Sequence, residues 1–422
     1  MKISVDGRAA PLDAALDRAA ALLAAARYPL VAGLGADVAG VRAALALAER
    51  LRGAVDHMAG DALSRDLGVL AEAGLLFVTP GEARARADVV VLVGDLARRM
   101  DWLAAVFGPG PSPLRGKAPA REVIALGDDA AVAAIAGAGP VTTAKVPAAK
   151  LPALLSAVSA RAGERKVDAG ALGRTTAKAV EVAVERLKAA RYGVLVWDAA
   201  GLDALSVELL AGLVKALNAA TRFAALPYPG DDGAMGAALV GGWTTAFPPR
   251  LGFRAGTPRH DPWEFDAARL VASGEVDAAV WVSALSPTPP PWTKGPPLVA
   301  LVQPGTKLPA GTPVVVEVAT PGGAHDAVLY DARAGGLVAV AAAKADETAP
   351  SVAAVLAGIL ARLPADAAAA TAAGEEKPAK NARAAVAGPA RKAKQPAGES
   401  AAAATKTRQA AKARPTKRGG RP

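Results

Sequence analysis

The stretch Ala87-Asp88-Val89-Val90-Val91-Leu92-Val93-Gly94 indicates the fold class of this chain. Its apolar residues form one continuous run between Asp88 and Gly94, without the alternation of a half-exposed strand. Runs of this kind are buried on both faces, as in the parallel sheets of α/β proteins. Amphipathic helices are predicted between such runs, for example Val38 to Arg52. The sequence therefore predicts an α/β fold.

The pattern of strands and helices recurs in the second half of the chain. Arg27-Tyr28 and the strand after it have a counterpart at Arg191-Tyr192, and Ala87-Asp88 has one at Val276-Asp277. We therefore predict two similar Rossmann-like parallel-sheet units, residues 1–165 and 166–365. The second unit carries a Gly/Pro-rich insertion at 228–262, to which no regular period fits. Such a segment is typical of a ligand-binding loop, or of an inherited structural or subunit-contact loop.

The net positive charge comes from the end of the chain. The charge is +10, and residues 375–422 hold 13 Lys and Arg against three Glu, which leaves 36 basic and 36 acidic residues before them. Residues 366–422 contain few large apolar side chains, so we predict a disordered basic tail. Because the tail lacks interleaved aromatic residues, we expect non-specific contact with polyanions at most and no specific nucleic-acid partner.

The residue types exclude several kinds of chemistry. The chain has no cysteine, which excludes disulfides, cysteine-ligated iron–sulfur clusters and thiol nucleophiles. Its histidines, His57, His260 and His325, are not spaced for a metal site, and His57 is interpreted as a residue between a helix and a loop. We predict no catalytic residue and no metal site. No leader and no run of about 18 uncharged apolar residues is seen, so we expect a cytoplasmic protein without a membrane span.

Two kinds of short motif permit either a ligand or a purely structural role. Residues Gly33 to Gly40 follow a strand and precede a helix, where backbone amides can hold a phosphate, but Asp37 is also suited to cap that helix. The turn at Ala199 to Leu202 offers a similar place. The adjacent carboxylates Asp128–Asp129 and Asp231–Asp232 are interpreted as caps and turns.

The insertion also carries a family resemblance. Gly233-Ala234, Trp243 to Pro248, Gly256 to Arg259 and Pro262 resemble, in the same order, a segment of the molybdopterin-carrying subunit of tungsten or molybdenum formylmethanofuran dehydrogenases. The resemblance extends over most of residues 1–363. It implies the core fold of the molybdopterin oxidoreductases, a group that includes formate dehydrogenase and DMSO reductase.

The departures from that family bear on function. Its cysteine cluster has no counterpart here, and its metal-ligating cysteine falls by register near Ala62, in an expected loop from Ala59 to Arg65. The chain therefore resembles the cofactor-free relative in the formyltransferase/hydrolase complex of methylotrophic bacteria. That complex transfers a formyl group from tetrahydromethanopterin to a methanofuran-type carrier and hydrolyses it to formate, in one-carbon (formaldehyde) oxidation. The resemblance implies a non-catalytic scaffold, the beta subunit, with alpha (amidohydrolase-like), gamma and delta (formyltransferase) partners.

The resemblance also implies how this chain could meet the carrier, although it implies no cofactor bound by the chain itself. Carriers of the family can have polyglutamate tails, which Arg250, Arg254 and Arg259 could contact through charge-assisted hydrogen bonds. His260 and Trp243 are further carrier-binding candidates. The alternative function is a degenerate oxidoreductase-fold protein that still binds a pterin or nucleotide cofactor.

Overall fold

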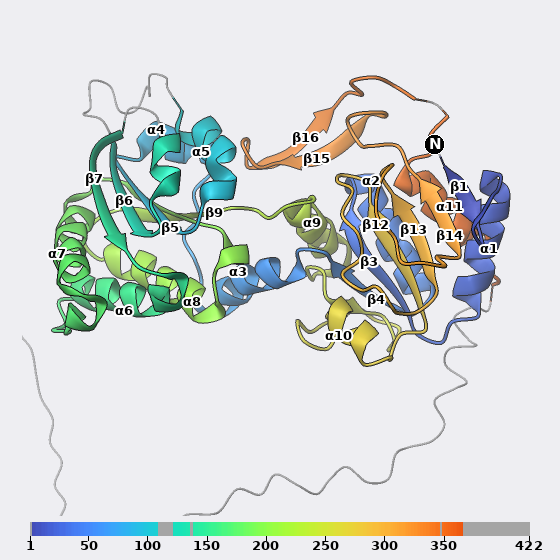
Figure 1. Ribbon diagram of the computed structural model, residues 1–422, viewed down its shortest axis with the longest axis horizontal. Coiled ribbons are helices and arrows are strands. Elements are labelled where there is room, and N and C mark those ends of the chain that lie inside the picture. Colours follow the sequence, from blue (N-terminus) through green and yellow to red (C-terminus); the bar gives the residue numbers. More distant parts are fainter. Residues whose placement is uncertain (1, 109–120, 136–137, 347, 366–422) are drawn as a thin grey trace, which may run out of the picture. The chain divides into compact units, whose positions relative to one another are not determined.

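Two sheets carry the fold in the computed structural model, which describes residues 2–108, 121–135, 138–346 and 348–365 (Figure 1). The predicted basic tail, 366–422, lies outside the described residues. The α/β class is confirmed, and Val89–Gly94, the central run of the opening stretch, is a strand whose six residues are all buried.

Sheet A has nine strands in the order β11-β10-β4-β3-β12-β13-β14-β1-β2. The centre from β4 to β14 is parallel, and short antiparallel strands extend both edges. Its strands are β1 Ile3–Val5, β2 Arg8–Ala9, β3 Pro29–Gly35, β4 Ala54–His57, β10 Leu251–Gly252, β11 Arg259–His260, β12 Ala278–Ser283, β13 Leu298–Val302 and β14 Val314–Glu317. The helices around it are α1 Leu12–Ala24, α2 Val38–Arg50, α9 Ala234–Thr245, α10 Ala267–Ala272 and α11 Val352–Arg362. One face packs on α1, α2, α9 and α11, and the other on α10.

Sheet B has five parallel strands in the order β7-β6-β5-β8-β9. They are β5 Val89–Gly94, β6 Arg121–Gly127, β7 Ala138–Lys145, β8 Gly193–Trp197 and β9 Phe223–Pro227. The helices around it are α3 Gly60–Ala73, α4 Pro80–Arg86, α5 Met100–Phe107, α6 Leu151–Ala162, α7 Arg174–Ala189 and α8 Ala204–Leu217. The short 3-10 turns are η1 Ala97–Arg99, η2 Ala130–Ala134, η3 Ala148–Lys150, η4 Ala169–Leu172 and η5 Ala199–Gly201. A separate hairpin pairs β15 Ala327–Asp331 with β16 Gly336–Val340.

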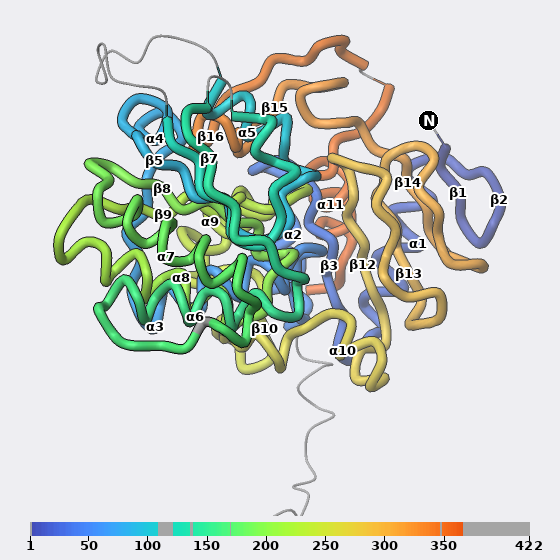
Figure 2. Tube along the Cα trace, turned by 60° about the vertical axis from the view of Figure 1, so that its left-hand side comes forward, coloured from blue at the N-terminus to red at the C-terminus, as the bar shows by residue number. Residues whose placement is uncertain are grey.

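The sheets are not assembled from consecutive halves of the chain. Sheet A joins β3 and β4 to β12, β13 and β14, so strands far apart in sequence lie side by side, as the blue β3 and the yellow β12 do in Figure 2. Sheet B joins β8 and β9 to β5, β6 and β7. In chain order, the five central parallel strands of sheet A read 2-1-3-4-5 and the strands of sheet B read 3-2-1-4-5, and both are orders of doubly wound folds. Each of these five-stranded parallel cores takes two strands from one half of the chain and three from the other. The predicted division into 1–165 and 166–365 does not follow the sheets.

The recurring Arg-Tyr and Asp motifs explain this arrangement. In sheet A the Asp277 carboxylate accepts hydrogen bonds from the backbone amides of Arg27-Tyr28, both at 2.9 Å. In sheet B the Asp88 carboxylate accepts them from Arg191-Tyr192, at 3.0 and 2.9 Å. Each Arg-Tyr pair is therefore tied to the aspartate of the other half. A repeat shows which strands are equivalent, but not whether they pair within a half or between halves.

Two segments expected to be irregular are helical. Within the insertion, residues 234–245 form α9, although glycine and threonine are poor helix formers. Packing overrides this weak propensity, because Ala237 and Val240 of α9 are buried in the core of sheet A. The expected loop at Ala59 to Arg65 instead contains the start of α3, which begins at Gly60.

Candidate functional site

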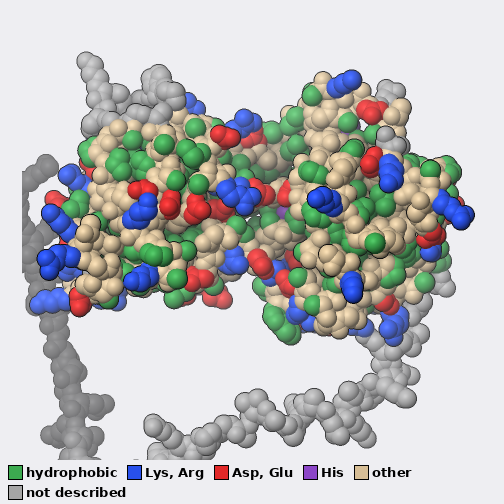
Figure 3. Space-filling model, viewed as in Figure 1, with side chains coloured by type: hydrophobic (Ala, Val, Ile, Leu, Met, Phe, Trp, Pro, Cys, Tyr) green, Lys and Arg blue, Asp and Glu red, His purple; other side chains and the backbone are tan. Residues whose placement is uncertain are grey.

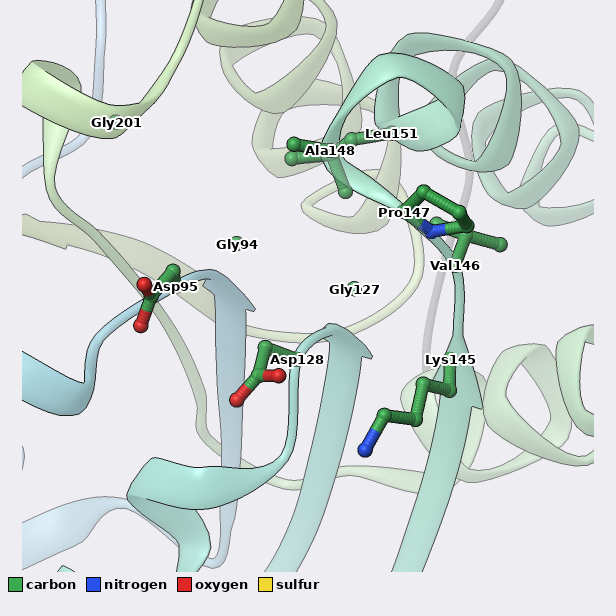
Figure 4. A pocket seen from close by; sticks show the side chains of 10 residues that line it. All are labelled: Gly94, Asp95, Gly127, Asp128, Lys145, Val146, Pro147, Ala148, Leu151 and Gly201. Atoms are coloured by element: carbon green, nitrogen blue, oxygen red, sulfur yellow. The ribbon is translucent and has the colours of Figure 1, made fainter.

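A cavity of about 490 Å³ opens at the carboxyl edge of sheet B (Figure 4). Its lining comes from the carboxyl ends of β5, β6 and β7 and from Gly201 after β8, the edge at which doubly wound sheets bind ligands. Its volume falls within the range of small-molecule sites. The lining residues are Gly94, Asp95, Gly127, Asp128, Lys145, Val146, Pro147, Ala148, Leu151 and Gly201.

Glycines end two of the strands that face this cavity, β5 and β6. Gly94 and Gly127 have φ angles of +74° and +109°, a region that side chains disfavour. A Cβ atom at Gly94 would lie 3.0 Å from the side chain of Leu202, and one at Gly127 would lie 3.3 Å from the Cα of Gly94. Both glycines therefore serve the tight packing of the strand ends as well as the shape of the cavity.

The polar groups of the cavity are mainly acidic. Asp95 and Asp128 follow the two glycines, and each accepts a hydrogen bond from the backbone amide two residues later, at 2.9 and 2.8 Å. These hydrogen bonds hold the turns that lead from the strands into η1 and η2. The ammonium group of Lys145 donates to Asp129 at 2.9 Å, which lowers the pKa of that carboxyl. Two carboxylates and one paired lysine suit hydroxyl or cationic groups better than phosphates.

The corresponding turn of sheet A, Gly33 to Gly40, is filled by the protein itself. Asp37 is buried and accepts a hydrogen bond from the amide of Gly40 at 2.9 Å, which confirms its role as helix cap. A Cβ atom at Gly33 would lie 2.4 Å from the carbonyl oxygen of Val282. Gly33 is therefore required by the close approach of β12. The Asp37 carboxylate already takes up the amide of Gly40, which an anion would otherwise bind.

Arg250, a predicted carrier ligand, lies inside a cluster of acceptors. Its guanidinium contacts Asp56 at 3.4 Å, Asp61 at 2.5 Å and Asp266 at 2.6 Å, and donates to the carbonyl of Pro262 at 2.6 Å. Burial raises the pKa of Asp56 to about 7, although the nearby Arg250 opposes this shift. Since the arginine side chain is only 8% exposed, we interpret it as a structural residue that ties the insertion to β4 and α3.

Arg254 and Arg259, two further carrier candidates, line one small pocket of about 80 Å³. The guanidinium of Arg254 lies 4.7 Å from the centre of the Tyr28 ring. Arg259 pairs with Glu264 at 3.3 Å and is largely exposed. Glu264 and Glu275 line the same pocket, so its charges balance locally.

The last two carrier candidates, His260 and Trp243, lie on different elements and make different contacts. His260 is on β11, its Nδ1 is 3.0 Å from the carbonyl oxygen of Arg250, and its ring stacks on Phe247. Trp243 is on α9, with 54% of its surface exposed. The structure thus brings Arg254 and Arg259 into one pocket, but it assigns Arg250 to the interior and Trp243 to a helix surface.

His57 is the last residue of β4, not a residue between a helix and a loop. Its Nδ1 accepts a hydrogen bond from the amide of Ala59 at 2.9 Å, so its Nε2 carries the proton and donates to the carbonyl of Asp232 at 3.1 Å. Burial lowers the pKa of His57 to about 4. The imidazole is therefore a neutral link between β4 and the segment before α9.

The sequence did not reveal a second ionic cluster, around Arg99. Its guanidinium forms a bidentate pair with Asp231, both contacts at 2.7 Å, and contacts Asp198 at 2.7 Å. It also lies 3.9 Å from the ring centre of Tyr228, whose hydroxyl donates to Asp231. The interpretation of Asp231 as only a turn residue was wrong. Its neighbour Asp232 accepts a hydrogen bond from Ser286, which follows β12 of sheet A. The two adjacent carboxylates therefore connect the segment between β9 and α9 to different sheets, Asp231 to sheet B through Arg99 and Asp232 to sheet A.

The described residues bring no group of three or more His, Cys, Asp or Glu side chains together as a metal site. Within the same part of the chain, no helix combines the length and the apolar composition needed to span a membrane. On the face drawn in Figure 3, Lys and Arg side chains are mixed with Asp and Glu side chains.

Comparison with known proteins identifies relatives along most of the chain. The B-type subunit of the formyltransferase/hydrolase complex Fhc from Methylorubrum extorquens is 35% identical over 368 residues, which are 85% of this chain and 96% of the relative. In the crystal structure of the complex FhcABCD from that organism with methylofuran, one chain matches with a TM-score of 0.75 and 34% identity, over 85% of this chain and 98% of its own. The B-type subunit of the tungsten-containing formylmethanofuran dehydrogenase 2 of Methanococcus maripaludis is 26% identical over 288 residues, 64% of each protein. No family model matches the chain.

Proposed function

This chain belongs to the family of the B-type subunits of formyltransferase/hydrolase complexes, and from this membership we propose that it is a non-catalytic scaffold in such a complex. The complex would transfer a formyl group from tetrahydromethanopterin to a methanofuran-type carrier and hydrolyse it to formate. The reacting groups would lie on the alpha (amidohydrolase-like) and delta (formyltransferase) partners, with a gamma subunit as the third partner. We expect this assembly in the cytoplasm.

The proposal rests on Ala62, which lies by register near the position of the metal-ligating cysteine in the dehydrogenases. Ala62 lies in the first turn of α3 and packs at the edge of the sheet B core, and an alanine methyl group cannot coordinate tungsten or molybdenum. The chain has no cysteine to replace it. The residues therefore do not fit the metal centre of the dehydrogenases, and no redox step is assigned to this chain.

The architecture supports a shared origin with those enzymes. We propose that sheets A and B, both doubly wound and with exchanged strands, are the core of the molybdopterin oxidoreductases kept without its cofactor. What remains is a folded α/β chain that could hold partner subunits, together with a cavity of small-molecule size.

Reconstitution of activity tests the proposal. The chain alone is expected to show neither formyl transfer nor hydrolysis, and a mixture of the other three subunits should gain stability or yield when it is added. Catalytic turnover by the purified chain alone would contradict the non-catalytic assignment. A complex that forms and functions fully without the chain would contradict the scaffold role.

A role in carrier binding is a second proposal, favoured by the pocket that Arg254 and Arg259 share. Both guanidinium groups could bind a carboxylate-bearing carrier. We expect the double variant Arg254→Ala/Arg259→Ala to bind the carrier about tenfold more weakly, with a steeper loss at high salt for the wild type. Unchanged affinity in calorimetry would end this proposal.

The alternative function, a retained pterin or nucleotide, would have its place in the cavity at the edge of sheet B. The carboxylates of Asp95 and Asp128 disfavour the phosphates of such a ligand, so this cavity supports the alternative less well than the scaffold function. Mass spectrometry of small molecules released from the denatured chain separates the two readings. Stoichiometric release of a pterin or nucleotide would establish the alternative.

A further inference from the structure

Helix α9, residues 234–245, is uncharged on all sides. No Lys, Arg, Asp or Glu occurs between Ala234 and Pro249, although 21% of the whole chain is charged. One face is accounted for, because Ala237 and Val240 are buried in the core of sheet A. A surface helix normally carries polar and charged residues on its other face, and a helix that is apolar all round is normally buried.

The outward face of α9 exposes large apolar side chains in a helical pattern. Met235, Leu239, Gly242 and Trp243 recur at i, i+4, i+7 and i+8, which places them on one side of the helix. Leu239 is 38% exposed and Trp243 is 54% exposed, and Phe247, just beyond the helix, is 36% exposed. Contiguous apolar surface of this kind, with aromatic residues in it, is typical of a protein interface.

Gly242 is a second and independent observation. A Cβ atom at this position would meet no atom of the chain within 4 Å, and the residue is exposed in the interior of the helix. A helical glycine costs about 1 kcal/mol relative to alanine, so this chain alone gains nothing from it. The preceding Gly241 differs, because its Cβ atom would lie 2.6 Å from the carbonyl oxygen of Phe247. Gly242 leaves space for the close approach of another backbone.

We propose that the outward face of α9, defined by Met235, Leu239, Gly242 and Trp243, binds another subunit of the same complex through an uncharged apolar surface of that subunit. The proposal rests on the proposed function, because the related chain was solved in an assembly of four different subunits. A charged carrier finds no ionic partner on this face. Trp243 is thereby assigned to subunit contact rather than to the carrier.

Co-expression of the full chain with the other three subunits of its complex tests the proposal. The variants are Leu239→Gln/Trp243→Gln, which makes the face polar, and Gly242→Ala, which fills the space on it. Matched controls lie on α8, where Leu205 is 52% exposed and the Cβ position of Gly212 is also open, so Leu205→Gln and Gly212→Ala make the same chemical changes elsewhere. Assembly is measured by size-exclusion chromatography and by affinity for the partner subunits.

We expect both α9 variants to bind the partner subunits at least about tenfold more weakly, while both α8 controls assemble like the wild type. Gly242→Ala should also raise the melting temperature of the isolated chain, so weaker assembly could not be blamed on misfolding. Normal assembly of both α9 variants would overturn the inference and leave the proposed function intact. Absence of any complex with the wild-type chain would overturn both this inference and the proposed function. If the α9 variants lost only the association of the chain with itself, the inference would also be overturned, because the face would then bind a second copy of the chain.

Discussion

At the scale of single residues, the structure explains why the adjacent acids Asp231 and Asp232 both matter. Asp231 is held by Arg99, and Asp232 by Ser286 on the side of sheet A. The sequence could suggest turns here, but not the ionic partner, because Arg99 is 132 positions away. Buried arginines with several acidic contacts, such as Arg99 and Arg250, leave no local pattern that a single sequence reveals.

Removal of the Asp231 charge tests this cluster. We expect Asp231→Asn to lower the free energy of unfolding by about 1–3 kcal/mol, because the buried guanidinium of Arg99 loses its bidentate partner. Urea unfolding of the full chain measures the change. Asp129→Asn, which removes the exposed partner of Lys145, is the control and should have no measurable effect. Equal stability of both variants and the wild type would contradict the role of Arg99.

The neutral His57 gives a pH dependence of known sign. Its pKa falls from 6.5 in the unfolded chain to about 4 in the folded chain, so its contribution to stability is full above pH 6.5 and is lost as the pH falls towards 4. Asp56 and Asp66, whose pKa values burial raises to about 7, act in the opposite direction. The effect of His57 therefore has to be taken from the difference in unfolding free energy between the wild type and a His57 variant at each pH. The pH dependence of the wild type alone also contains the opposite effects of Asp56 and Asp66.

We expect the difference in unfolding free energy between the wild type and His57→Gln to shrink by up to about 3 kcal/mol between pH 7 and pH 4. Glutamine does not titrate, so the difference isolates the imidazole. Urea titrations at half-unit pH steps measure it. A difference that stays constant over this range would show that His57 is not buried as a neutral group.

At the scale of elements, strands were easier to predict than α9. The strands β5 and β13 follow continuous apolar runs, and the structure has them where the runs occur. Helix α9 has no such signal, since its glycines and threonines favour other conformations and its packing alone makes it helical. The irregular interpretation of the insertion failed for that reason.

Two neighbouring glycines of α9 are expected to respond in opposite ways. Gly241→Ala should lower the melting temperature, because its Cβ atom would overlap the carbonyl oxygen of Phe247. Gly242→Ala should raise the unfolding free energy by about 0.5–1 kcal/mol. It lowers the conformational entropy of the unfolded chain, and its Cβ atom meets no other atom in the folded chain. Thermal unfolding of the two variants measures both. The same response from both positions would mean that α9 does not pack as described.

At the scale of the whole molecule, the recurring motifs predicted two units of the same kind but not their exchange of strands. Both possible pairings bury the same apolar runs, so composition and periodicity cannot distinguish them. The ties from Asp88 to Arg191-Tyr192 and from Asp277 to Arg27-Tyr28 select the exchanged form. For the candidate sites, the sequence predicted that Arg254 and Arg259 act together, and the two side chains line one pocket. It did not predict the larger cavity, because the residues that line it are spread along the sequence from Gly94 to Gly201.

The exchange of strands has a direct consequence for fragments. Residues 1–165 and 166–365, expressed separately, should each lack a cooperative thermal transition, because each sheet needs strands from both. Mixed or co-expressed, the two fragments should form a one-to-one complex with restored helical signal in circular dichroism. Independent cooperative folding of either fragment would contradict the exchanged arrangement.

Native mass spectrometry of this chain, purified at moderate salt from its own host, tests the central claim most directly. We expect a complex with an amidohydrolase-like subunit, a formyltransferase and a further subunit. This polypeptide should dissociate from it at its sequence mass of 42.0 kDa, within normal terminal processing. Stoichiometric tungsten, molybdenum or iron on this polypeptide, a bound nucleotide, or a chain that comes out alone would contradict it.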